Sequence, residues 1–182
     1  MGSPYYQTEN ERETLRETLE ALAELNNKEL IAYWIGQELK EAEMYHRLHK
    51  LSKEANWDER IPRLFLQLYK ESLGHAETLL GMFKQMFPDE RPPQVDLPAL
   101  EVELSEKQLV EMIRTGELRG GILKYLMGTE RMARDVYHYL AERNENEDAK
   151  ATLIWLANIE EGHYQKLRNV YTALFEEEPG GE

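Results

Sequence analysis

Glu160 and His163 stand three residues apart in the run Glu160-Glu161-Gly162-His163. Residues three apart share one face of a helix, so this pair can offer a carboxylate oxygen and an imidazole nitrogen to one metal ion. A buried glutamate is rare unless it is paired or bound to a metal. The same face carries the apolar residues Leu153, Leu156, Ala157, Tyr164 and Leu167. The pattern therefore predicts a metal site inside the protein.

A second pattern occurs twice and places a glutamate two helical turns before a tyrosine. The sequence Gly-x-Glu-x6-Tyr contains Glu38 and Tyr45 in the first half of the chain, and Glu130 and Tyr137 in the second. Both glutamates fall on apolar helical stripes and are predicted metal ligands. The tyrosines are predicted to donate hydrogen bonds to ligand carboxylates. The alternative is a buried carboxylate satisfied by a tyrosine hydroxyl alone.

The two halves also share a Gly-His pair, which contains His75 in the first half and His163 in the second. The halves differ three residues earlier, where the first half has Ser72 in place of a glutamate. Serine is a poor ligand for divalent iron or manganese. Glu41 and Glu71 are two further candidates to supply the missing oxygen. Otherwise the site binds a second metal weakly or has degenerated.

Each of these patterns includes a glycine, namely Gly36, Gly74, Gly128 and Gly162. A glycine inside a helix costs about 1 kcal/mol relative to alanine. We expect the four glycines to let helix backbones approach closely around a crowded site.

Helices must position these residues, and the apolar spacing predicts five of them. The chain should form a short helix over about 9–25 and long helices over about 28–53, 62–87, 119–143 and 147–175. Four prolines in the connection 88–118 exclude a continuous helix there, and the capping box Ser105-Glu106-Lys107-Gln108 predicts a short helix within it. Two helix pairs joined by one long crossover are typical of a ferritin-like four-helix bundle. We expect an N-terminal extension over 1–27, the bundle over 28–175 and a disordered acidic tail over 176–182.

Composition limits the other possibilities. The 182 residues contain no cysteine, which excludes disulfides and thiolate metal sites, and the net charge of −13 makes nucleic acid an improbable partner. No apolar run approaches the roughly 20 residues that span a membrane, and no signal peptide is evident. A cytoplasmic location is the default expectation.

At Glu38, His75, Glu130, Glu160 and His163 the sequence resembles the rubrerythrin branch of the ferritin-like superfamily. The resemblance extends over about residues 28–175 and fails at Ser72. It implies a centre of two iron ions, or of manganese or a mixed pair, with Glu160 as the bridging ligand and Glu38 and Glu130 as terminal ligands.

The resemblance also implies a function. Members of this branch reduce hydrogen peroxide, oxidise ferrous iron or activate dioxygen. Many carry a rubredoxin domain with four cysteine ligands, so this cysteine-free chain would need a separate electron donor. We also expect a homodimer, with the first helix either capping the bundle or mediating dimerisation. The alternatives are an iron-handling bundle without rapid turnover and a structural bundle with a partly decayed site.

Overall fold

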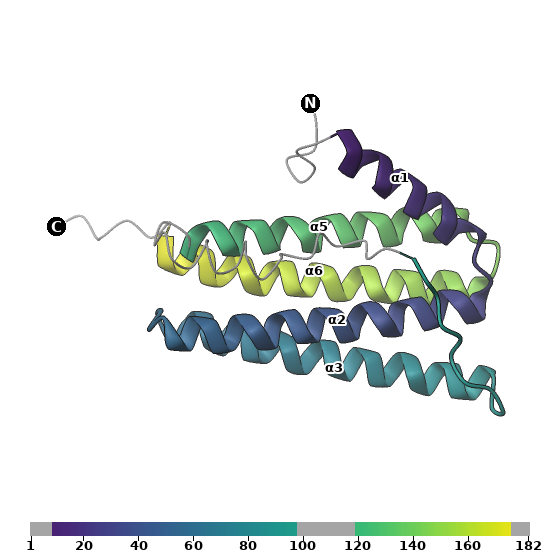
Figure 1. Ribbon diagram of the computed structural model, residues 1–182, viewed down its shortest axis with the longest axis horizontal. Coiled ribbons are helices and arrows are strands. Elements are labelled where there is room, and N and C mark those ends of the chain that lie inside the picture. Colours follow the sequence, from purple (N-terminus) through teal and green to yellow (C-terminus); the bar gives the residue numbers. More distant parts are fainter. Residues whose placement is uncertain (1–8, 98–118, 176–182) are drawn as a thin grey trace.

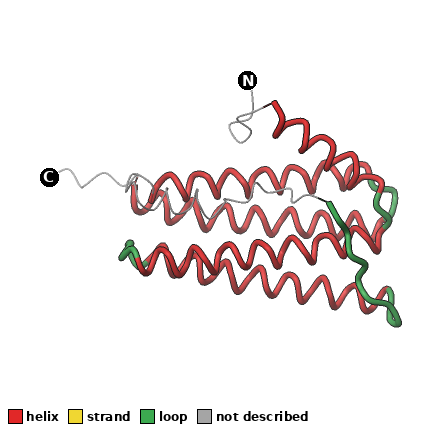
Figure 2. Tube along the Cα trace, in the orientation of Figure 1, coloured by secondary structure: helices red, strands yellow, loops and turns green. Residues whose placement is uncertain are grey.

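The computed structural model describes residues 9–97 and 119–175, and these residues form helices joined by loops, without a strand (Figure 2). The helices are α1 (Glu9–Glu24), α2 (Asn27–Glu54), α3 (Arg60–Met86), α5 (Arg119–Arg143) and α6 (Glu147–Phe175). The five helices expected in these ranges are confirmed. The expected short helix of the crossover and the acidic tail lie outside the described residues.

Local side-chain contacts explain where two of the long helices begin. The Asn26 side chain accepts a hydrogen bond from the Glu29 backbone N–H, and the Glu29 side chain accepts one from the Asn26 N–H, which completes a capping box for α2. Asn146 Oδ1 accepts a hydrogen bond from the Ala149 N–H at the start of α6. Such contacts satisfy backbone donors that a helix leaves unpaired in its first turn.

The four long helices run alongside one another as two pairs (Figure 1). Helix α2 packs closely against α3, and α5 packs closely against α6, whereas contacts between the pairs are fewer. The short loops within each pair make its helices antiparallel neighbours. The connection after α3 leaves the end of that helix and crosses toward the other pair (Figure 1). This is the ferritin-like connectivity expected from the sequence.

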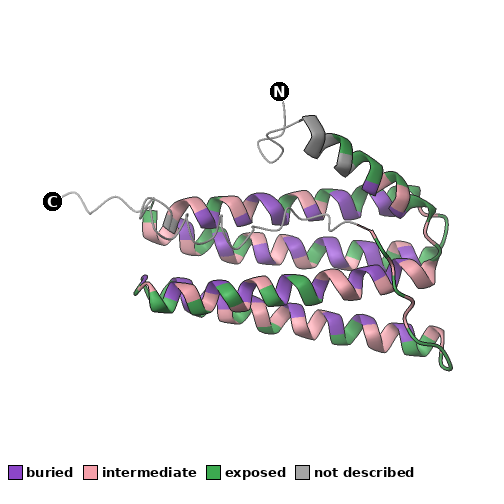
Figure 3. Ribbon diagram, in the orientation of Figure 1, coloured by how far each residue is buried: buried purple, intermediate pink, exposed green. Residues whose placement is uncertain are grey.

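The bundle has two apolar clusters, one on either side of a polar middle layer. On α6 the first cluster includes Leu153 and Leu156 and the second includes Leu167. On α2 they include Trp34 and Leu48 in the same order. Buried residues recur along the length of the four long helices (Figure 3). The clustered glutamates and His163 therefore lie at mid-length, between the two apolar clusters.

Helix α1 packs on one end of the bundle, near α5 (Figure 1). Its Leu22 is buried within the first apolar cluster, and Leu19 packs against that cluster. Of the two roles expected for this helix, capping agrees with these contacts, and dimerisation stays a prediction. No helix within residues 9–97 and 119–175 has the length and apolar character needed to cross a membrane.

Candidate metal centre

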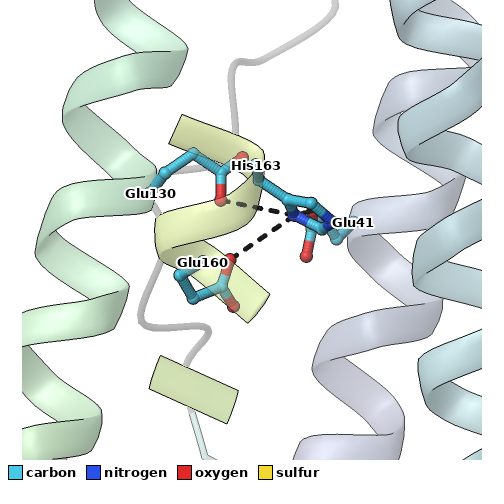
Figure 4. A group of neighbouring side chains, drawn as sticks. All are labelled: Glu41, Glu130, Glu160 and His163. Atoms are coloured by element: carbon cyan, nitrogen blue, oxygen red, sulfur yellow. Dashed lines mark ion pairs between the residues drawn. The ribbon is translucent and has the colours of Figure 1, made fainter. Parts of the chain in front are cut away.

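Four ionisable side chains from three helices converge at the middle of the bundle. Glu41 comes from α2, Glu130 from α5, and Glu160 and His163 from α6 (Figure 4). Each offers one ligand atom, and these four atoms all lie within 4.8 Å of one another. All four side chains are buried, with exposed fractions of 5% or less.

His163 lies at the centre of this group. Its Nδ1 atom is 3.1 Å from Glu41 Oε1, 3.6 Å from Glu130 Oε2 and 3.6 Å from Glu160 Oε2. Figure 4 shows the two carboxylates of Glu130 and Glu160 directed toward the imidazole. The sequence interpretation of Glu160 and His163 as inward-facing neighbours on one helix face thus agrees with the structure.

The two remaining predicted ligands form an adjoining pair. His75 Nδ1 lies 3.4 Å from Glu38 Oε2, and the ring of His75 lies 5.5 Å from that of His163. Glu38 is buried, whereas the His75 side chain is 20% exposed. The five residues proposed as ligands from the sequence therefore occupy one contiguous region, whose His75 side is closer to solvent.

Ser72, the departure from the repeat, faces the same region. It is fully buried, and its hydroxyl oxygen lies 3.3 Å from Glu41 Oε1 and 2.9 Å from the Leu68 carbonyl oxygen. Glu41 was one of two candidates for the missing carboxylate, and the structure places it inside the cluster.

Glu71, the other candidate, lies at the edge of the site. Its Oε2 atom is 3.6 Å from His163 Nε2 and 3.0 Å from Lys166 Nζ, and its Oε1 accepts a hydrogen bond from Gln67. The side chain is 29% exposed. Sequence reasoning missed Lys166, although its spacing of three residues after His163 indicates the same side of the helix.

The two tyrosines of the repeat lie in different apolar clusters of the bundle. The Tyr45 hydroxyl donates a hydrogen bond to Glu130 Oε1, as expected for a residue that orients a ligand carboxylate. Tyr137 is buried in the first apolar cluster, where its ring lies edge-on to Trp34 at 4.6 Å between centroids. The role of Tyr137 toward a ligand stays a prediction.

The expected role of the glycines is wrong for three of the four. A Cβ atom at Gly36 or Gly74 would meet nothing within 4 Å, and at Gly162 it would meet only Lys166 Nζ at 3.9 Å. No neighbouring backbone approaches these three positions, so their glycines are not needed for close packing of the helices.

Burial and mutual charge change the acidity of the clustered residues. Burial, followed by the charges of Glu41 and Glu130, raises the pKa of Glu160 well above its ordinary value. Burial and the Glu130 charge also raise the pKa of Glu41. Burial by itself would lower the pKa of His163, but the surrounding carboxylates raise it well above the ordinary value. Glu41, Glu160 and His163 therefore hold their protons more tightly than free side chains do. Burial by itself would raise the pKa of Glu130, but the hydrogen bond and charge of His163 lower it.

His75 has the opposite tendency. Burial, followed by the charge of His163, lowers the pKa of His75 to about 4. A neutral imidazole is the form that binds a metal ion. His75 therefore stays ready for metal binding at every pH near neutrality.

These residues fit a pair of divalent cations. Oε2 of Glu130, Oε2 of Glu160 and both ring nitrogens of His163 are buried without a hydrogen-bond partner among the described residues. Buried charge of this density is costly unless cations balance it. Once deprotonated, the four carboxylates of Glu38, Glu41, Glu130 and Glu160 would carry four negative charges, which two divalent cations would neutralise. Carboxylate and imidazole together suit iron and manganese.

Fold and site together define a ferritin-like helical bundle with a carboxylate-rich centre. Comparison with known families gives the same result, because the Rubrerythrin family matches residues 29–171. The chain belongs to the rubrerythrin family.

A solved structure supports the fold. A hypothetical protein from Pyrococcus furiosus superposes with a TM-score of 0.61 at 25% sequence identity, over 89% of this chain and 98% of that chain. A comparison with curated proteins found no match.

Proposed function

We propose that this protein is a non-haem di-metal oxidoreductase that reduces hydrogen peroxide or oxidises ferrous iron, with two iron ions, or manganese or a mixed pair, as its cofactor. The observation that carries the proposal is the convergence of Glu41, Glu130, Glu160 and His163 at one buried point. The adjoining pair of Glu38 and His75 supplies donors for a second ion. Membership of the rubrerythrin family supports the same conclusion.

When bound, two redox-active ions would supply the two electrons that convert one hydrogen peroxide and two protons into two waters. The protein's own residues would set the conditions for that reaction. Glu130 and Glu160 would hold the ions from the α5–α6 pair, and Glu38 and His75 from the α2–α3 pair. The apolar clusters on either side would exclude bulk water and strengthen every charge interaction in the site.

The His75 side of the site is the expected entrance for peroxide or dioxygen. His75 is partly exposed, and its ring lies edge-on to Trp155 at 5.8 Å between centroids. Trp155 also lines a surface groove between α3 and α6, together with Met82 and Thr152. A small oxidant could approach the His75 side of the centre from this groove.

For repeated reduction of peroxide, electrons would come from a group outside these 182 residues, because the sequence has no cysteine that could hold a rubredoxin-type iron. A separate electron-transfer protein or a small reductant would fill this role. The homodimer and the cytoplasmic location stay predictions.

The test combines metal analysis with turnover. Metal-free protein is titrated with ferrous iron under anaerobic conditions, and hydrogen peroxide is then added in known amounts. We expect two ions per chain and the oxidation of two ferrous ions per peroxide, both lost in Glu130→Gln. Glu43→Gln, at an exposed position of α2, is the matched control.

Two results would contradict the proposal. Absence of bound iron and manganese after reconstitution would remove the metal centre altogether. If two ions bind but the protein neither consumes peroxide nor oxidises ferrous iron with dioxygen, the result would instead favour an iron-handling bundle.

A further inference from the structure

The two halves of the bundle carry the same set of donors, but with one carboxylate exchanged between helices. The second half has Glu130 on α5 and Glu160 with His163 on α6; one turn after Glu130 stands Ala133. The first half has Glu38 on α2 and His75 on α3. The first half has a further acid, Glu41, one turn after Glu38 on α2, and the equivalent residue of the second half is Ala133. The residue of the first half that is equivalent to Glu160 is Ser72.

Both exchanged positions are buried, so the exchange lies in the site and not on the surface. Ser72 is fully buried, Ala133 is 2% exposed and Glu41 is 5% exposed. Each half thereby offers two carboxylates and one imidazole. A change at only one of these positions would alter the buried charge by one unit, whereas the paired change keeps it constant.

Contacts around Glu41 show that it reaches the place that Ser72 leaves open. Glu41 Oε1 lies 3.3 Å from the Ser72 hydroxyl and 3.1 Å from His163 Nδ1. The Ser72 hydroxyl also lies 2.9 Å from the Leu68 carbonyl, and its single proton can serve one acceptor at a time. The Ser72 hydroxyl can therefore donate to Glu41 or to the Leu68 carbonyl, but not to both at once.

We propose that Glu41 is a metal ligand that replaces the carboxylate missing at position 72, and that Ser72 is a positioning residue whose small side chain makes room for it. This inference rests on the proposed metal centre. It removes the motive for a decayed site, because the donor set has four carboxylates and two imidazoles once Glu41 is included.

The experiment moves the carboxylate back from α2 to α3. Four variants are compared with the unaltered protein: Glu41→Ala, Ser72→Ala, Ser72→Glu and the exchange Glu41→Ala with Ser72→Glu. The exchange gives the first half the same arrangement as the second. Ferrous and manganous ions are titrated by calorimetry, and bound metal is counted after desalting. Circular dichroism of each metal-free variant shows whether it folds.

We expect the unaltered protein and Ser72→Ala to bind two ions. Glu41→Ala should weaken one of the two by at least about 10-fold, the low end of the cost of losing even a supporting residue at a metal site. Ser72→Glu alone should not tighten binding, because it adds a fifth buried carboxylate. The exchange variant should recover two ions.

Two outcomes would overturn the inference without affecting the proposed metal centre. The first is that Glu41→Ala binds two ions with unchanged affinity. The second is that the exchange variant folds but binds no better than Glu41→Ala. Failure of the unaltered protein to bind any metal would contradict the proposed function itself, so the two failures are distinguishable.

Discussion

The Tyr45 hydroxyl on α2 donates a hydrogen bond to Glu130 Oε1 on α5, a residue 85 positions later in the chain. This contact connects the two helix pairs at the level of the site. It fixes the orientation of a carboxylate that also faces His163. A hydrogen bond of this kind leaves the other oxygen of Glu130 available for a metal ion.

Replacement of Tyr45 by phenylalanine tests this contact. Tyr45→Phe should weaken metal binding by about 10–100-fold, because residues that orient a ligand contribute that much to affinity. The measurement is calorimetric titration of ferrous iron. Tyr69→Phe is the matched control, since Tyr69 is half-buried and stacks on His46 away from the site. Equal affinities in the two variants would show that the hydrogen bond does not orient Glu130.

Metal removal should destabilise the protein. A ligand that binds only the folded state adds about 2.7 kcal/mol at 100 times its dissociation constant. For a chain of this size, about 1 kcal/mol corresponds to about 2–4 °C in Tm. Chelation should therefore lower Tm by several degrees, measured by calorimetry with and without a chelator. An unchanged Tm in a sample that analysis shows to be metal-loaded would contradict this expectation.

Stability of the metal-free protein should depend on pH through Glu160. Burial and the charges of Glu41 and Glu130 raise the pKa of Glu160 well above its ordinary value, so the folded state keeps a proton that the unfolded state releases. The stability from this proton is complete below the unfolded pKa and is lost as pH rises through the folded pKa. Glu160→Gln cannot lose that proton. Its Tm advantage over the unaltered protein should therefore grow between pH 5 and pH 8.

Metal-loaded protein should behave in the opposite way, because ligands must be deprotonated to bind a cation. Occupancy should rise with pH in the unaltered protein and should be low at every pH in Glu160→Gln. Parallel pH dependences of the two metal-free proteins, by scanning calorimetry, would show that the Glu160 proton does not contribute.

Removal of the capping box at the start of α2 should lower the stability of the protein without changing its metal binding. Asn26→Ala removes the side chain that accepts a hydrogen bond from Glu29, which should cost about 1 kcal/mol. Tm should fall by about 2–4 °C. The number of bound ions should not change, because Asn26 lies three turns from Glu38. A loss of bound metal in this variant would link the helix end to the centre.

The sequence by itself determined the helices and the inward face of each. Apolar spacing and the caps at Asn26 and Asn146 are local signals, so the observed bounds of α2, α5 and α6 agree closely with those expected. The same periodicity put Glu38, Glu130 and Glu160 on buried faces, since a residue's place on a helix follows from its position along it. The repeat of Gly-x-Glu-x6-Tyr then indicated two related half-sites.

Only the tertiary structure decided which acids meet. Glu41 and Glu71 were equal candidates from spacing, yet Glu41 lies among the buried ligand atoms and Glu71 turns toward Lys166 at the edge. That choice depends on how α2 and α3 rotate against the other pair, which no local pattern specifies. The role of the glycines could not be read from the sequence for a similar reason, because only the packed helices show that the space beside Gly36, Gly74 and Gly162 is open.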